Sequence, residues 1–188
     1  FLMIWSQANQ DIKDQKSELQ TEMNLILESR AQEIEHWIHH QFDVLRDISA
    51  NESQKIYIDT LLDAKSTPEK KEGSETFLRN YLKRMAEDND FVTPPRELEI
   101  EANVVKARQH AIFNIHLDRE NEPSMGFMVP IYPVDAKDNA KPIAYVVGIK
   151  QVAKELYPLL QQHGDPDKSF EIYLTQLEEA TGGGAVKY

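Results

Sequence analysis

The feature that most constrains this chain is an uninterrupted helical pattern at its beginning. No proline or glycine precedes Pro68, so nothing in roughly the first third of the chain forces a break. Apolar residues recur between Ile12 and Ile48 in steps of three, four or seven, the spacing of one stripe along a helix. We therefore predict one helix from about Ile4 to Ile48. At 1.5 Å per residue it would be ~67 Å long, and we expect its N-terminal half to project as a stalk.

The first half of this helix contains a coiled-coil-like seam. Ile12, Leu19 and Ile26 are seven residues apart, which keeps them on one side of a helix. A seam of this kind needs a partner helix to cover it. We therefore predict a parallel homodimer through this part of the chain.

The two ends suggest that the chain belongs to a longer, membrane-anchored protein. Phe1–Trp5 is entirely apolar, and tryptophan is typical of membrane interfaces. We interpret this segment as the last turn of a transmembrane helix; the alternative is a turn that packs on the domain's own core. Thr181–Tyr188 is a glycine-rich turn that leads into a strand-like run, so we expect the chain to continue, and a second lobe beyond it stays open.

After residue 50 the pattern predicts short helices and then strands. Helices are expected over Ser53–Leu62, from an N-cap at Ser74 to about Asp88, and over Leu98–His110, with an exposed loop over Ala64–Ser74. Strands are expected over Ala111–Leu117, Met125–Val134, Ile143–Ile149 and Phe170–Leu174, with one helix starting near Val152 and a further strand over Ala185–Tyr188. The prediction is an α+β fold, in which residues 1–50 form the stalk helix and 51–188 a lobe of helices packed on an antiparallel sheet.

Composition excludes several classes of function. The net charge of −11 argues against nucleic acid as a partner, because nothing offsets the repulsion from phosphates. The absence of cysteine removes thiol catalysis, disulfides and cysteine-ligated metals. We find no strained serine elbow, no phosphate-cradling glycine loop and no His-Glu-x-x-His helix. We therefore predict a non-catalytic chain without a cofactor.

With these elements in order, the chain resembles the extracytoplasmic sensor domains called Cache, or PDC (PAS-like), of bacterial transmembrane receptors. The similar segments are SRAQEIEHWIHHQFDVLRDIS in the long helix, ETFLRNYLKRMAEDNDF, the strand pair SMGFMVPIYP and PIAYVVGIKQVAKELYPLL, and FEIYLTQL. The resemblance implies a PAS-like sheet, a small-molecule pocket on one sheet face and a helical stalk continuous with a transmembrane helix. It also implies a location at the outer, periplasmic face of the inner membrane and an intracellular histidine kinase, diguanylate cyclase or chemoreceptor output.

Two departures from the family pattern stand out. Members usually have a strand, a D-x-x-G type turn and another strand after the helix that ends here near Phe91, whereas this chain passes directly from Pro94–Pro95 to Arg96. The arginine, tryptophan and tyrosine pattern of amino-acid-binding members is also missing. The resemblance therefore names no ligand.

The candidate ligand-binding residues are arginines and aromatics. A pocket with arginine in its wall would suit an anionic small molecule, because guanidinium pairs with carboxylates through two hydrogen bonds. The alternative is that the arginines form surface ion pairs and the aromatics are core. The candidates are Arg79, Tyr81, Arg84, Arg108, Phe113, Phe127, Tyr132 and Tyr145.

Three histidines on the long helix allow a second chemical hypothesis. His36, His39 and His40 have the spacing that places imidazoles on one helix face, with Glu33 or Glu35 as a further metal ligand. We favour the simpler interpretation, a polar helix face, and predict no metal site. Sensor and interaction module are the two function classes that remain.

Overall fold

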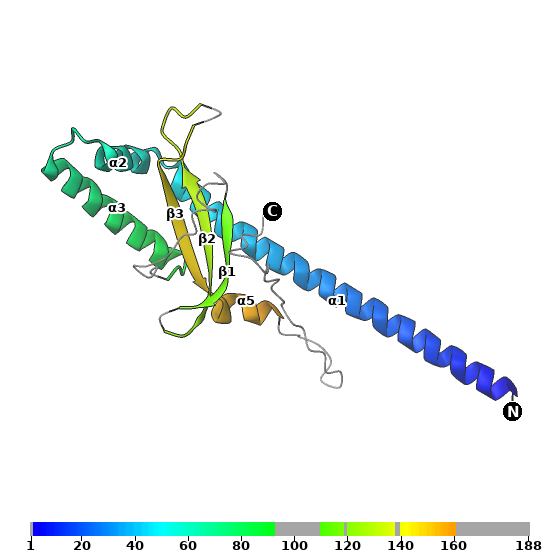
Figure 1. Cartoon of the computed structure of the whole chain (residues 1–188). Helices are drawn as coiled ribbons and strands as arrows, with labels where there is room; N and C mark the ends of the chain where they lie inside the picture. The colour runs from blue at the N-terminus through cyan, green and yellow to red at the C-terminus, as the bar shows by residue number, and fades with distance from the viewer. Residues whose placement is uncertain (1, 93–109, 119, 138–139, 161–188) are drawn as a thin grey trace, which may run out of the picture. The chain divides into compact units, whose positions relative to one another are not determined.

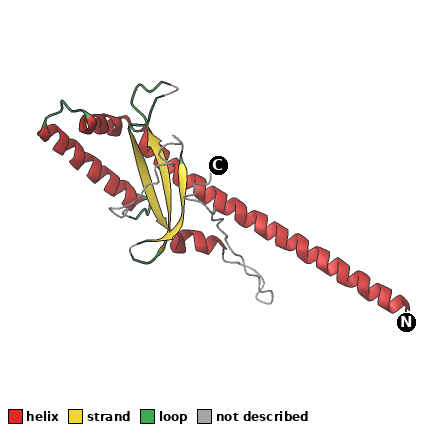
Figure 2. Cartoon of the chain, viewed as in Figure 1, coloured by secondary structure: helices red, strands yellow, loops and turns green. Residues whose placement is uncertain are grey.

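The computed structural model describes residues 2–92, 110–118, 120–137 and 140–160. The elements in chain order are α1 (Leu2–Ala50), α2 (Glu52–Leu62), α3 (Pro68–Asp88), β1 (Ala111–Leu117), β2 (Pro123–Ile131), β3 (Ala144–Gln151) and α5 (Val152–Leu160) (Figure 1). The strands pair antiparallel in the order β1-β2-β3 (Figure 2). The predicted α+β fold with a long N-terminal helix is confirmed. The elements expected over residues 98–109, 170–174 and 185–188 lie outside the described residues.

Helix α1 belongs to two compact units. The first unit is Phe1–Trp37 and the second is Ile38–Tyr188. In the second unit Phe42, Leu45 and Ile48 are buried, and the Phe42 ring meets Phe127 of β2 edge-on with 5.5 Å between ring centroids. The last turns of α1 are therefore part of the core of the second unit. Within the described part of the chain, no helix has an apolar stretch long enough to cross a membrane.

Local capping residues set the starts of α2 and α3. Asn51 caps α2, and its side chain accepts a hydrogen bond from the Gln54 backbone N–H at 3.4 Å. Thr67 caps α3 in the same way through Lys70 N–H, and Pro68 occupies the first helical position, where a missing N–H costs nothing. The predicted loop up to residue 74 and the predicted cap at Ser74 are therefore wrong. Ser74 is buried inside α3, where its hydroxyl donates to the Lys70 carbonyl at 2.9 Å.

The two faces of the sheet carry different apolar clusters. Because side chains alternate along a strand, Phe127 and Gly148, which are register partners, lie on the face that meets α1. The opposite face carries Met128 and Ala111, both buried, with Phe113, Tyr145 and Val147 packed against them. Both faces of β2 are therefore buried, as its nearly continuous apolar sequence requires.

The end of α3 fixes the segment that leads to the sheet. Asp90 has φ = 54°, and the Phe91 N–H donates to the Ala86 carbonyl at 2.9 Å, which is the Schellman arrangement of a helix C-terminus. Val92 N–H then donates to the Ile149 carbonyl on the outer side of β3 at 2.9 Å. This geometry carries the Phe91 ring onto Gly148.

We predict that adding a methyl group at Gly148 destabilises the fold. An alanine Cβ there would lie 2.5 Å from Phe91 Cε1 and 3.1 Å from Leu45 Cδ2, so Gly148→Ala should lower the free energy of unfolding by about 1–3 kcal/mol. Gly73→Ala is the matched control. It lies inside α3 with no atom near the added Cβ, so it should raise stability by about 0.5–1 kcal/mol. Urea unfolding of both variants checks this, and equal effects would contradict the packing described.

We also predict that the β1–β2 turn makes stability depend on acid pH through Asp118. Its carboxylate accepts hydrogen bonds from the Glu122 and Glu120 backbone N–H groups, both at 2.9 Å, and from the Ser124 hydroxyl at 3.1 Å. These hydrogen bonds hold the pKa of Asp118 below its ordinary value, and the bond from the Glu122 N–H has the largest effect. Burial acts in the opposite direction but is outweighed. Because the folded pKa is the lower one, this contribution is present above the unfolded pKa and is lost as pH falls through the folded pKa.

Thermal melts between pH 6 and pH 2.5 test this turn. Asp118→Asn should lose less stability than the unchanged chain over the acid range. Parallel curves for the two proteins would show that the turn carboxylate contributes nothing.

Candidate functional site

An apolar pocket of about 420 Å³ lies in the second unit, between the sheet and the helices. Its volume falls in the range of small-molecule sites, about 300–1,000 Å³. The described wall residues come from the end of α1, the facing sides of α2 and α3, the segment after α3, and strands β2 and β3. They are Leu45, Ile48, Gln54, Ile58, Leu78, Leu82, Met85, Ala86, Phe91, Val92, Ile131 and Ala144–Gly148.

One polar side chain stands out in this wall. Gln54, on the first turn of α2, is only 2% exposed, and its Nε2 has no hydrogen-bond partner among the described residues. A buried amide without a partner is unusual, because most buried polar groups are hydrogen-bonded. Among the described wall residues none carries a charge.

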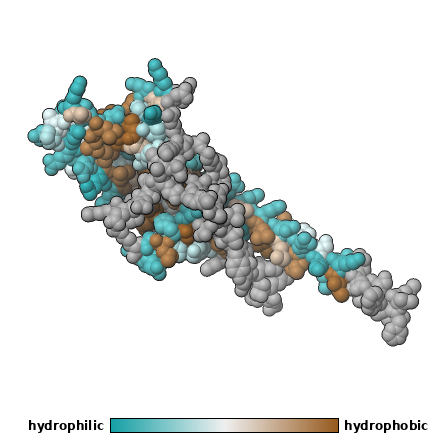
Figure 3. All heavy atoms as spheres, in the orientation of Figure 1, coloured by the Kyte–Doolittle hydropathy of each residue, from teal (hydrophilic) through white to brown (hydrophobic). Residues whose placement is uncertain are grey.

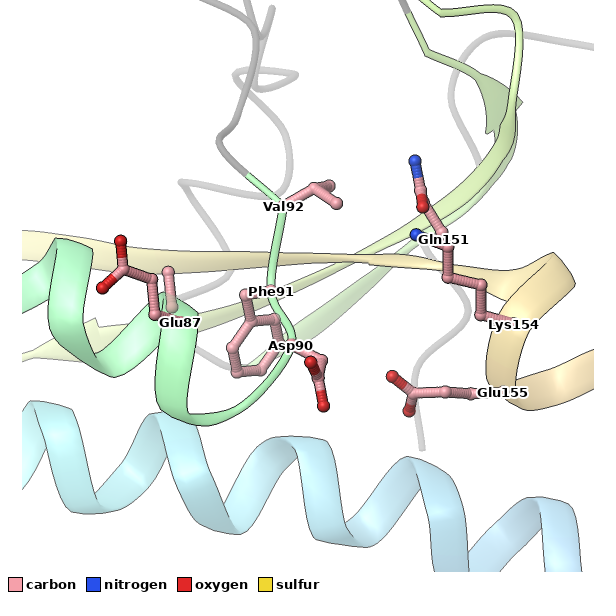
Figure 4. A pocket seen from close by; sticks show the side chains of 8 residues that line it. Glu87, Asp90, Phe91, Val92, Gln151, Lys154 and Glu155 are labelled. Carbon is pink, nitrogen blue, oxygen red and sulfur yellow. The ribbon is translucent and has the colours of Figure 1, made fainter.

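A second, polar pocket of about 430 Å³ adjoins the first. The two share Ala86, Phe91 and Val92, and the polar pocket adds Glu87, Asp90, Gln151, Lys154 and Glu155. Figure 4 shows the side chains of Asp90 and Glu155 pointing toward one another near the Phe91 ring. Its described wall carries three carboxylates and one ammonium, Lys154, and Glu155 also pairs with the Lys150 ammonium, so the excess of negative charge at this pocket is small.

Lys150 joins the elements around the polar pocket. Its ammonium donates to the Asn89 carbonyl at the end of α3 and to Glu155 Oε1 of α5, both at 2.7 Å, and lies 5.0 Å from the centroid of the Phe91 ring. The side chain is only 5% exposed. The buried Lys150 ammonium therefore links β3 to the end of α3, to α5 and to the Phe91 ring.

Two of the three predicted arginines, Arg79 and Arg84, are not among the described wall residues of either pocket. The side chains of Arg79 and Arg84 are 73% and 81% exposed, and each forms an ion pair along α3, with Glu75 and Asp88 respectively. Arg108 lies outside the described residues. The described pocket walls thus contain no arginine that could bind the anionic ligand we expected.

The predicted aromatics fall into separate groups. Tyr145 contributes to the wall of the apolar pocket and also packs with Phe113 on the Ala111–Met128 cluster. Phe127 is fully buried against Phe42 on the sheet face that meets α1, and it is not among the described wall residues. Tyr81 stacks on Phe77 of the same helix, and Tyr132 lies half-buried just after β2. Ligand binding at these positions stays a prediction, and only Tyr145 is found in the pocket wall.

The histidines of α1 do not form a metal cluster in the part of the chain that is described. His36, His39 and His40 are exposed, and no group of three His, Cys, Asp or Glu side chains there could hold an ion.

The sequence offered only partial signals for the pocket. The apolar positions of α3 that line it, Leu78, Leu82 and Met85, were visible as a helical stripe. Gln54 gave no signal, because a glutamine in a short amphipathic helix is ordinarily exposed.

Comparison of the chain with protein-family models, with curated proteins and with solved structures gives no match.

We predict that Lys150 stabilises this region, whereas its neighbour Lys154 does not. Lys150→Met should lower the free energy of unfolding by about 2 kcal/mol, because it leaves Glu155 and the Asn89 carbonyl without their charged donor. Lys154→Met, an exposed change on α5, should change it by less than about 0.5 kcal/mol. Denaturant unfolding compares the two, and a similar cost for both would argue against the bridging role.

Proposed function

We propose that this chain is the ligand-sensing part of a signalling receptor, and that the apolar pocket is where it binds a small molecule. The pocket supports this proposal because its wall includes Leu45 and Ile48 of α1 together with the α2–α3 hairpin and β3. An occupant would touch all of these elements at once. Its binding would favour whichever arrangement of α1 and the hairpin gives the better contacts.

The setting of the sensor rests on the resemblance to Cache domains. We propose a periplasmic or otherwise extracytoplasmic location, a membrane anchor in the parent protein and no catalytic role for this chain. The signal would pass along α1, which is one helix from Leu2 to Ala50.

The composition of the wall bears on the ligand. Apolar side chains dominate it, and no charged residue occurs among its described members. Burying a charged ligand group there would be costly because no opposite charge is available to pair with it. We therefore favour an uncharged, mainly apolar ligand over the anionic one that the arginines suggested.

We predict that filling the apolar pocket abolishes ligand binding. A thermal-shift screen of neutral apolar compounds, organic acids, amino acids, polyamines and divalent metals should give stabilisation by one class, worth roughly 2.7 kcal/mol at 100 times the dissociation constant. Ile58→Trp, in the pocket wall, should remove that stabilisation. Leu62→Trp, on the same helix but exposed, should retain it.

Far-UV circular dichroism shows whether each variant keeps its fold. A hit that survives in folded Ile58→Trp would place binding elsewhere and contradict the proposal.

The alternative function is a protein-interaction module without a small ligand. It is favoured by exposed apolar side chains on the α2–α3 hairpin, among them Ile56, Leu62 and Phe77. Figure 3 shows apolar surface over this part of the molecule. If no compound class raises the melting temperature in the thermal-shift screen, the protein-interaction module becomes the favoured function.

A parallel homodimer is part of the proposal. Within the first unit, Ile12 and Leu19 are 60% and 43% exposed although both are large and apolar, and Ile26 continues the same seam. A second copy of the helix in parallel register would cover all three.

We predict that Leu19→Asp with Ile26→Asp gives monomers in analytical ultracentrifugation, because four buried carboxylates would face each other across the seam. The matched control is Ser17→Asp with Asn24→Asp, which adds the same charge on the opposite side of the helix. A dimer that persists in the seam variant, or one lost in both, would contradict the seam.

A further inference from the structure

We propose that Gln54 is the polar anchor of the apolar pocket and that the ligand is an uncharged molecule with a hydrogen-bond acceptor, such as a carbonyl oxygen, on an apolar body. This inference rests on the proposed binding role of the pocket. It adds the chemical class of the ligand and the residue that selects it.

The first support is the state of the Gln54 side chain. Gln54 is a wall residue of the apolar pocket, it is 2% exposed, and its Nε2 has no partner among the described residues. An amide N–H buried without an acceptor has lost its water and gained nothing in return. An acceptor on a molecule in the pocket is the group that would restore the missing bond.

The second support is the contrast with Gln41. This glutamine of α1 is equally buried at 2% exposure, but it has an interaction partner and is not among the described wall residues of the pocket. A glutamine can therefore be buried in this fold and still have an interaction partner. The unsatisfied one is the one that borders the pocket.

The rest of the wall defines what the anchor can select. The described wall residues are apolar apart from Gln54 and Tyr145, whose side chain packs on the opposite sheet face, and none is charged. A carboxylate or an ammonium would be buried without a counter-charge, whereas a neutral acceptor needs only one donor. Small sites of this kind gain specificity from a few placed polar groups in an apolar wall.

Three probes of nearly the same size test this class. Acetophenone has a carbonyl acceptor, α-methylstyrene replaces that oxygen by a methylene group, and benzoate replaces the acetyl group by a carboxylate. Each is titrated into the whole chain and followed through the methyl NMR signals of Ile58, Leu78 and Leu82 in the pocket wall. We expect acetophenone to bind about tenfold more tightly than α-methylstyrene, and benzoate to bind most weakly.

Gln54→Leu should remove the preference and not the pocket. In this variant acetophenone should lose about tenfold in affinity, while the affinity for α-methylstyrene stays the same or rises. Gln41→Leu should leave the preference for acetophenone intact.

The same two variants test the missing bond without any probe. Gln54→Leu deletes an amide whose Nε2 has no bond to lose, so its melting temperature should not fall. Gln41→Leu loses an existing interaction and should melt roughly 3 °C lower or more.

The outcomes separate the two proposals. Equal binding of acetophenone and α-methylstyrene to the unchanged chain would overturn the role of Gln54 and leave the pocket as a binding site. A preference for acetophenone that persists in Gln54→Leu would do the same. Titrations that shift none of the three wall residues would overturn both the anchor and the pocket.

Discussion

The packing at Gly148 is the constraint on which the second unit depends. Two elements meet β3 at this one residue: α1 through Leu45, and the segment after α3 through Phe91. Neither could approach the strand so closely if it carried a side chain there. The close approach sets Phe91 between the apolar and the polar pocket, because this residue belongs to the walls of both.

Two further interactions hold Phe91 in that position. The Schellman turn at the end of α3 directs the chain back toward the sheet, with Asp90 in the left-handed region. The Lys150 ammonium then fastens the Asn89 carbonyl to β3 and lies over the Phe91 ring. A backbone turn, a buried cation and a missing side chain thus act together to place one aromatic ring.

This arrangement would couple occupancy of the apolar pocket to the packing of α1 on the sheet. Its wall is made of elements that are distant in sequence, and α1 contributes Ile48 and Leu45, the residue that packs on Gly148. A molecule that enters would compete with or complete this packing. Because packed interiors change between discrete arrangements more readily than they deform continuously, such a pocket suits a two-state sensor.

The helices and strands followed from local patterns. The stripe of α1 and the β-branched run of β1 were readable because their periodicity reports directly on burial. The predicted start of α3 at Ser74 was wrong, because the Thr67 side chain caps this helix and Pro68 occupies its first position. Ser74, one turn further on, satisfies its hydroxyl within the helix instead.

The site followed from the sequence far less. Arg79 and Arg84 were predicted to bind an anionic ligand. Each instead pairs at the surface with an acidic residue four positions away on α3. Gln54 stands out only because it lines the same pocket as residues of α1, α3 and β3. Periodicity within one element carries no information about such a meeting of elements.

The most direct test of the account is whether the apolar pocket is open to an apolar guest in solution. Xenon enters apolar cavities without needing a polar contact, so methyl NMR spectra under xenon pressure report on the pocket alone. If the pocket is open, the shifts will be concentrated on Ile58, Leu78, Leu82 and Met85, and the exposed Leu62 will be unchanged. Shifts absent from those wall residues would mean that the pocket is closed, and would contradict a small-molecule site between these helices and the sheet.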